Sequence, residues 1–201
     1  MDGQGDFEEM YRAAGDDLGS LPWANLEPFP ALVEWLDGEP AAPGGRALVI
    51  GCGYGDDAEE LARRGFEVAA FDFAPTAIAR ARERFPASAV DYRVADLFDL
   101  PAEWAGAFDL VVEIRTLQSL PIEDRAPAPA AIAATLAPGG LLWLFALARD
   151  ERVPGGTRPW SLVPAELARL EEAGLEWQWR RDDPLAEGHY DVTGLLRRPP
   201  A

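Results

Sequence analysis

Residues 46–72 read RALVIGCGYGDDAEELARRGFEVAAFD, and this stretch decides the fold. The apolar run Ala47–Ile50 is typical of a buried strand, and it stops at a turn that contains three glycines. Residues 56–64 then place apolar side chains at helical spacing. A second apolar run, Phe66–Phe71, ends at Asp72. The stretch therefore predicts a strand, a glycine-rich turn, a helix and a second strand of a doubly wound sheet.

The turn between these strands favours a ligand that contains a nucleoside. Glycines let a ligand approach the backbone, and free amides at a helix N-terminus hold an anion. Asp72 follows at the distance from which an acid accepts hydrogen bonds from ribose hydroxyls. Asp56 and Asp57 would repel a pyrophosphate, whereas a cofactor with one carboxylate, an amino group and a sulfonium tolerates them. We therefore expect S-adenosylmethionine rather than NAD; the alternative is a doubly wound domain that binds no cofactor.

Length and charge narrow the class of protein. The chain has 201 residues and a formal net charge of −17, which argues against binding to nucleic acid or to an anionic membrane surface. Cys52 is the only cysteine, so no intrachain disulfide is possible. The N-terminus lacks the apolar core of a signal peptide, and the run Leu141–Ala148 is too short to span a bilayer. We expect a cytoplasmic protein with one domain, residues 1–201, in which a helical lid segment (1–40) precedes a Rossmann-like core (41–201).

The remaining elements alternate as an α/β fold requires. Five further strands are expected, the last two as an antiparallel hairpin: 90–94, 108–114, 141–147, 175–181 and 190–196. Five further helices are expected, at residues 6–14, 30–36, 76–85, 124–136 and 164–173. A turn at residues 138–140 (PGG) should precede the strand at 141–147.

Several side chains outside the first stretch are candidates for the site. Trp23, in a proline-rich loop, is either a hydrophobic plug or a lid wall over the cofactor. Asp96 follows the third strand, where it can accept a hydrogen bond from an exocyclic amine such as adenine N6 or act as an ordinary turn aspartate.

A second group of candidates concerns the methyl acceptor. Glu113 is the only charge in the otherwise apolar run Leu110–Ile114 at the end of the fourth strand, so it should reach the crevice or pair with an arginine such as Arg115. Arg115 recognises an acidic acceptor or merely pairs with Glu113. His189, in the hairpin loop, is an alternative base or a solvated surface histidine.

The glycine turn, Asp72, Asp96 and the turn at 136–140 (LAPGG) occur together in an order and spacing that resemble class I S-adenosylmethionine-dependent methyltransferases. More narrowly, residues 47–58 and 71–78 resemble the thiopurine methyltransferase family and its thiol and halide methyltransferase relatives. So do Pro22–Trp23 and the spacing of the prolines that follow. The resemblance implies helices on both faces of a seven-stranded sheet with order 3-2-1-4-5-7-6, in which strand 7 is antiparallel.

The resemblance also implies roles for individual residues. Trp23 should contact the cofactor, Asp72 should bind the ribose, and Asp96 with Leu97 should flank adenine. Gly51 and Gly53 should pack against the methionine moiety of the cofactor. Cys52 and Phe73 should also belong to the cofactor site. Glu113 is expected both in this site and, with Arg115, in catalysis.

The expected function is methyl transfer to a small molecule, with a thiol, a selenol or a halide as candidate acceptors. O- or N-methyl transfer and cofactor binding without catalysis are the alternatives. In-line transfer to an ionised acceptor needs alignment and desolvation but no metal, and we expect none. A hydroxyl or amine acceptor needs a base as well. We expect a monomer or a homodimer.

Overall fold

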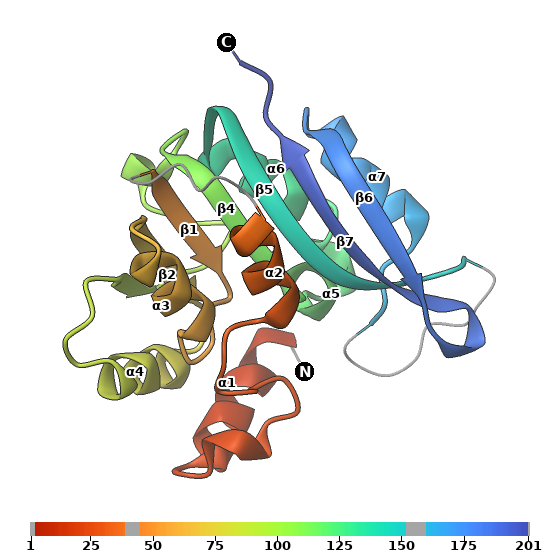
Figure 1. Cartoon of the computed structure of the whole chain (residues 1–201). Helices are drawn as coiled ribbons and strands as arrows, with labels where there is room; N and C mark the ends of the chain where they lie inside the picture. Colours follow the sequence, from red (N-terminus) through yellow and green to blue (C-terminus); the bar gives the residue numbers. More distant parts are fainter. Residues whose placement is uncertain (1–2, 39–44, 152–159, 201) are drawn as a thin grey trace. The chain divides into compact units, whose positions relative to one another are not determined.

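The computed structural model describes residues 3–38, 45–151 and 160–200. Its seven strands form one sheet in the order β3-β2-β1-β4-β5-β7-β6. Strand β7 runs antiparallel to β5 and to β6, and Figure 1 shows β5 and β7 side by side along most of their length. The predicted sheet order and the antiparallel seventh strand are confirmed. The predicted boundary between a lid segment and a core falls at residues 40 and 41, which lie outside the described residues.

The chain forms two compact units, residues 1–99 and 100–201. The first unit carries three parallel strands, because β1 pairs with β2 and β2 pairs with β3. Its elements are α1 (Gly3–Ala14), η1 (Leu18–Ser20), α2 (Pro30–Gly38), β1 (Arg46–Ile50), α3 (Asp56–Arg63), β2 (Glu67–Asp72), α4 (Pro75–Arg84) and β3 (Asp91–Val94). In β1 and β2 every residue after the first is buried, as a strand covered on both faces requires.

The second unit carries the other four strands. Its elements are η2 (Ala102–Trp104), β4 (Phe108–Ile114), α5 (Thr116–Ser119), η3 (Ile122–Asp124), α6 (Ala128–Thr135), β5 (Leu136–Arg149), α7 (Pro164–Glu172), β6 (Glu176–Pro184), η4 (Ala186–Gly188) and β7 (His189–Arg197). Trp104, Trp143 and Phe108 are the largest fully buried side chains of this unit. No helix among the described residues is both long and apolar enough to cross a membrane.

Prolines and glycines move two predicted boundaries. The helix predicted over Asp124–Leu136 begins only at Ala128, because Pro127 and Pro129 lack the amides that an earlier helix interior would need. The predicted turn at 138–140 lies inside β5, which already begins at Leu136. There the amide of Gly139 donates to the carbonyl of Arg198, so the glycines continue the ladder through an irregular stretch.

Two local predictions in the second unit are wrong. His189 does not lie in the hairpin loop: it is the first residue of β7 and pairs with Arg149, so the ladder extends further than the apolar pattern indicates. The residues after β4, where no helix was expected, contain the single helical turn α5, which is too short to give a sequence signal.

Asp57 fixes the approach to α2. Its side chain projects from the first turn of α3, and its Oδ1 accepts a hydrogen bond from the backbone amide of Phe29 at 2.7 Å. Phe29 in turn starts α2, since its carbonyl accepts from Leu32 and Val33. Burial raises the pKa of the Asp57 carboxyl to about 6, although the Phe29 amide opposes this shift. The ionised form of Asp57 therefore costs the folded state free energy.

Replacing Asp57 with asparagine should stabilise the protein near neutral pH. Because the folded pKa lies above the ordinary value of 3.8, the wild type loses stability as pH rises from about 4 to about 6. An asparagine carries no charge and keeps an oxygen for the Phe29 amide, so Asp57→Asn should gain about 1–3 kcal/mol above that window. Urea unfolding of both proteins across this pH range measures the difference. Parallel stability curves would contradict the assignment, and Asp57→Ala, which loses the acceptor, is the control for the hydrogen bond.

Candidate functional site

The turn between β1 and α3 has a backbone that favours glycine at three positions. Gly51, Gly53 and Gly55 all have positive φ, at 61°, 52° and 92°. A side chain at these positions would be strained, because L-residues rarely adopt this region. The amide of Cys52, between two of the glycines, donates to the carbonyl of Phe71 at 2.9 Å, which joins the turn to the end of β2. The glycine pattern in the sequence therefore reports a backbone conformation that the structure contains.

Asp72 ends β2 and holds this turn. Its Oδ2 accepts the amide hydrogen of Gly53 at 2.9 Å, and its Oδ1 accepts that of Ala74 at 2.9 Å. Burial raises the pKa of the Asp72 carboxyl, and these amides, with that of Phe73, partly offset the shift. An ionised carboxylate offers about four lone-pair directions, so three amides leave room for a further donor. A ligand hydroxyl can therefore bind Asp72 without displacing its structural bonds.

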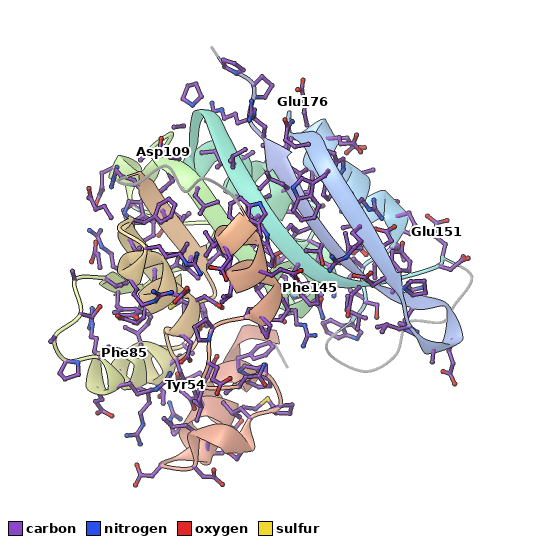
Figure 2. All side chains as sticks on the ribbon, viewed as in Figure 1. Tyr54, Phe85, Asp109, Phe145, Glu151 and Glu176 are labelled. Carbon is purple, nitrogen blue, oxygen red and sulfur yellow. The ribbon has the colours of Figure 1, made fainter. Side chains whose placement is uncertain are left out.

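A cluster of aromatic side chains packs beside the turn. Tyr11 of α1 makes edge-on contacts with Trp23, at 5.9 Å between ring centroids, and with Tyr54, at 5.2 Å. Trp23 also meets Phe7 edge-on at 5.4 Å, and its Nε1 donates to the Tyr11 hydroxyl at 3.1 Å. Tyr54, labelled in Figure 2, comes from the glycine turn itself. Trp23 is thus part of a packed wall beside the turn, and its contact with a cofactor stays a prediction.

Helix α1 is attached to α4 through polar contacts. The carboxylate of Glu8 accepts from the Thr76 amide at 3.0 Å and from the Thr76 hydroxyl at 2.7 Å. One helical turn further on, Arg80 donates to the carbonyl of Gly15 at 3.1 Å. Glu8 and Tyr11 are three residues apart and lie on one helix face. The attachment to α4 therefore fixes where Tyr11 stands.

The ends of β2 and β3 expose apolar side chains around a turn aspartate. Phe73 and Phe98 are each 40% exposed, whereas Leu97 is buried. Asp96 Oδ1 accepts a hydrogen bond from the Phe98 amide at 3.0 Å, so Asp96 acts as a turn aspartate, which is one of the two roles expected for it. Exposed rings beside a carboxylate suit a flat base with an exocyclic amine. The adenine role of Asp96, Leu97 and Phe73 remains a prediction that fits these surroundings.

Arg84 and Tyr92 brace the glycine turn from the other side. Arg84, near the end of α4, makes a two-bond ion pair with Asp56 at 2.7 Å and donates to the carbonyl of Tyr54 at 2.8 Å. The hydroxyl of Tyr92 donates to Glu59 at 2.8 Å and lies 3.3 Å from the carbonyl of Gly55. A side chain at Gly55 would overlap that hydroxyl. The sequence pattern gives no sign of either brace, since both come from distant elements.

In the second unit, Glu113 lies at the carboxyl end of β4 and is 0% exposed. Its Oε1 accepts the amides of Thr116 at 2.6 Å and Leu117 at 2.9 Å, so it caps the short helix α5. Burial raises the pKa of Glu113 to about 7 against the effect of these amides. Its Oε2 is buried and has no hydrogen-bond partner within the described residues. The expected partnership with Arg115 is not found, because backbone amides hold this carboxylate.

Arg115 faces the other strands of its unit. It has a positive φ of 61°, its amide donates to the carbonyl of Phe145 at 2.8 Å, and its guanidinium lies 5.2 Å from the Phe145 ring centroid. Phe145 is labelled in Figure 2 on β5. Asp191 of β7 is close enough for the positive charge of Arg115 to oppose the rise that burial causes in its pKa. The Arg115 side chain itself is exposed and can meet a ligand.

Gln118 is a further site candidate, which was not among the site residues expected from the sequence. Its side chain is fully buried, and its Oε1 accepts the amide of Leu147 on β5. Its Nε2 is buried without a hydrogen-bond partner among the residues that the structure describes. Tyr11 was equally overlooked: it lies in the helix expected at residues 6–14, but helical periodicity does not indicate the role of a tyrosine hydroxyl.

The sequence matches proteins of known class. Residues 47–140 match the family described as "Methyltransferase domain". The chain is 34% identical, over 190 residues, to a ubiquinone biosynthesis O-methyltransferase of Xanthomonas axonopodis pv. citri (strain 306), with 85% of this chain and 74% of that protein covered.

Solved structures share the fold. The 1,6-didemethyltoxoflavin-N1-methyltransferase of Burkholderia thailandensis, solved with S-adenosylhomocysteine, has a TM-score of 0.72 at 19% identity, covering 98% of this chain and 87% of that one. A TehB-like S-adenosylmethionine-dependent methyltransferase from Corynebacterium glutamicum has a TM-score of 0.68 at 22% identity, covering 96% and 99%.

The brace from Tyr92 predicts a specific rescue. Gly55→Ala should destabilise the protein by about 2 kcal/mol or more, because it combines a left-handed backbone with an overlap on the Tyr92 hydroxyl. Tyr92→Phe removes the nearest overlapping atom, so the double variant should lose clearly less than the sum of the two single losses. Thermal unfolding of the four proteins gives this coupling. Strict additivity would show that the strain at Gly55 arises from its backbone alone.

Proposed function

Because the chain belongs to the class I S-adenosylmethionine-dependent methyltransferases, we propose that it methylates a hydroxyl group of a small, negatively charged acceptor. S-adenosylmethionine is its cofactor, and the chemistry that this cofactor supplies when bound is an electrophilic methyl group on a sulfonium. The chain's own residues then have three tasks: they hold the cofactor, align the acceptor and take up its proton.

The first unit offers a fitting set of groups for the cofactor. Asp72 retains a lone pair for a ribose hydroxyl, and the exposed rings of Phe73 and Phe98 border the turn of Asp96, where adenine would lie. The glycine turn brings backbone, rather than side chains, to the surface beside Asp72. The residues proposed to hold the cofactor are Trp23, Gly51, Cys52, Gly53, Asp72, Phe73, Asp96, Leu97 and Glu113. Cys52 remains a thiol, since burial and the charge of Asp72 raise its pKa well above the usual value.

The state of Glu113 carries the proposal that the attacking atom is oxygen. A hydroxyl must lose a proton during transfer, whereas a thiolate or a halide arrives ready to attack. With its pKa near 7, Glu113 can accept that proton at neutral pH. Its free Oε2 can receive the proton while Oε1 keeps α5 in place.

Gln118 complements Glu113. Among the residues that the structure describes, Glu113 Oε2 is an acceptor without a partner and Gln118 Nε2 is a donor without one. Both residues belong to the segment around α5. A hydroxyl can donate to a carboxylate and accept from an amide at the same time. Leaving two such buried atoms unpaired costs about 1–3 kcal/mol each, so an acceptor that pairs them gains binding energy.

Arg115 supports an acidic acceptor. Its side chain is exposed. Its backbone amide donates to the carbonyl of Phe145, and its guanidinium lies over the ring of the same residue. With a formal net charge of −17, the chain as a whole repels anions, so binding an acidic molecule requires a local cation. Arg115 provides one within two residues of Glu113.

The similarity to ubiquinone biosynthesis O-methyltransferases supports oxygen as the attacked atom. The second candidate is transfer to a thiol, a selenol or a halide, as the narrower resemblance implied. The contact of Trp23 with Tyr11 favours it, because Trp23 belongs to the Pro22–Trp23 motif on which that resemblance rests. A panel of hydroxylated acids, thiols and iodide, with S-adenosylhomocysteine formation as the common readout, separates the two. Turnover confined to thiols or iodide would exclude the hydroxyl proposal.

Glu113→Gln should lower kcat about 10²- to 10³-fold, because the base is lost while Gln still offers an oxygen to the amides of α5. In the wild type, kcat should rise with pH as Glu113 loses its proton near pH 7 and should then level off. The variant should lack this rise. Glu113→Ala, which also loses the cap, should in addition unfold at a lower temperature. A Glu113→Gln enzyme with wild-type kcat and pH profile would remove Glu113 from catalysis.

Arg115→Ala should discriminate between acceptors. Loss of a charge-assisted contact should lower kcat/KM for anionic acceptors roughly tenfold to a hundredfold, and leave neutral analogues within about twofold. Arg181, an exposed arginine of β6 paired with Asp183, provides a matched control variant, Arg181→Ala, that should change neither. Equal losses on both acceptors would assign Arg115 a structural role.

A further inference from the structure

Tyr11 lies against the glycine turn, although no sequence motif names this residue. Its hydroxyl oxygen would lie 3.2 Å from a Cβ built on Gly53, so the hydroxyl and the turn are in contact. The side chain is only 5% exposed, and Gly53 is the residue whose amide binds Asp72. Tyr11 therefore reaches, from α1, the point where the glycine turn meets the end of β2.

The hydrogen-bonding capacity of Tyr11 is only half used. A phenol hydroxyl donates once and accepts. Here its oxygen accepts from Trp23 Nε1 at 3.1 Å, which orients the hydroxyl, and no acceptor for its hydrogen is found among the described residues. Burial, and after it the charge of Asp72, raises the pKa of Tyr11 well above its usual value. The group consequently keeps its hydrogen at neutral pH and offers it next to Asp72.

We infer that Tyr11 is a further cofactor-binding residue, whose hydroxyl donates a hydrogen bond to the ribose hydroxyl that Asp72 accepts from. This inference rests on the proposed ribose role of Asp72. The ribose hydroxyl would accept from Tyr11 and donate to Asp72, so each group uses a capacity that the protein leaves open. Trp23 is then a positioning residue that fixes the Tyr11 hydroxyl.

The charge of Asp72 selects the ribose over the other end of the cofactor. A cofactor carboxylate placed against the Tyr11 hydroxyl would also lie close to the Asp72 carboxylate, and like charges repel. A neutral hydroxyl has no such penalty and offers both a donor and an acceptor. The contact is therefore expected with any ligand that carries the ribose, whether or not it carries the amino acid portion.

Tyr54 provides a matched control. It belongs to the same cluster, packs edge-on against Tyr11 and is equally buried, but its hydroxyl makes no hydrogen bond to Trp23 or to any other residue that the structure describes. Tyr11→Phe and Tyr54→Phe each remove one oxygen atom and keep the ring. Calorimetric titration with S-adenosylhomocysteine and with 5′-methylthioadenosine, which lacks the amino acid portion, then tests the two hydroxyls against each other.

Tyr11→Phe should weaken both ligands roughly fivefold to tenfold, as loss of one neutral hydrogen bond predicts, and Tyr54→Phe should weaken neither by more than about twofold. Thermal unfolding of both variants confirms that each is folded. Unchanged binding by Tyr11→Phe, or an equal loss in Tyr54→Phe, overturns the inference. So does a loss for S-adenosylhomocysteine alone, because it places Tyr11 at the amino acid portion.

Asp72→Asn separates this inference from the proposal beneath it. If Asp72→Asn weakens both ligands and Tyr11→Phe does not, the role of Asp72 stands and that of Tyr11 fails. If Asp72→Asn binds both ligands as the wild type does, both fail. In the double variant the losses should fall short of the product of the single losses, because the two side chains share one ligand hydroxyl.

Discussion

The carboxylate of Asp72 is the group around which the first unit is arranged. It is buried at the end of a parallel strand, and the backbone amides of Gly53 and Ala74 stabilise it there. A buried charge without such partners would be too costly to keep. The same two bonds tie the glycine turn to β2 and start the chain toward α4. Tyr92 and Arg84 brace the turn from behind, and Tyr11 closes on it from α1.

Glu113 repeats this device in the second unit. Both acids lie at the carboxyl ends of parallel strands, both accept backbone amides from residues that come shortly after them, and burial raises the pKa of both. They differ in what remains free. Asp72 has both oxygens engaged, whereas Glu113 keeps one oxygen without a partner among the described residues and a pKa near 7. The first carboxylate is therefore suited to accept hydrogen bonds from a ligand, and the second is suited to accept a proton.

The family and its cofactor limit the chemistry but do not name the acceptor. Methyl transfer makes few demands on the protein beyond alignment, so acceptor choice depends on a handful of side chains at strand ends. In this chain Glu113, Arg115 and Gln118 are polar groups at and after the end of β4, and each is held by a backbone bond to α5 or β5. We propose that they act as a base, a cation and an amide donor toward an acidic hydroxylated molecule.

The sequence by itself determined where the strands lie, because apolar runs and turn glycines act locally. Its resemblance to class I methyltransferases implied the order of these strands in the sheet, which the structure confirms. It also indicated Asp72, Asp96 and Glu113, since acids directly after apolar runs stand out without any structure. It failed where partners are distant in the chain: the start of β5 at Leu136 and that of β7 at His189 depend on pairing between strands. Only the tertiary structure shows that Tyr11 lies against Gly53 and that Glu8 binds Thr76. It also shows that backbone amides, and not Arg115, are the partners of Glu113. Such contacts depend on how elements pack, and no local pattern encodes them.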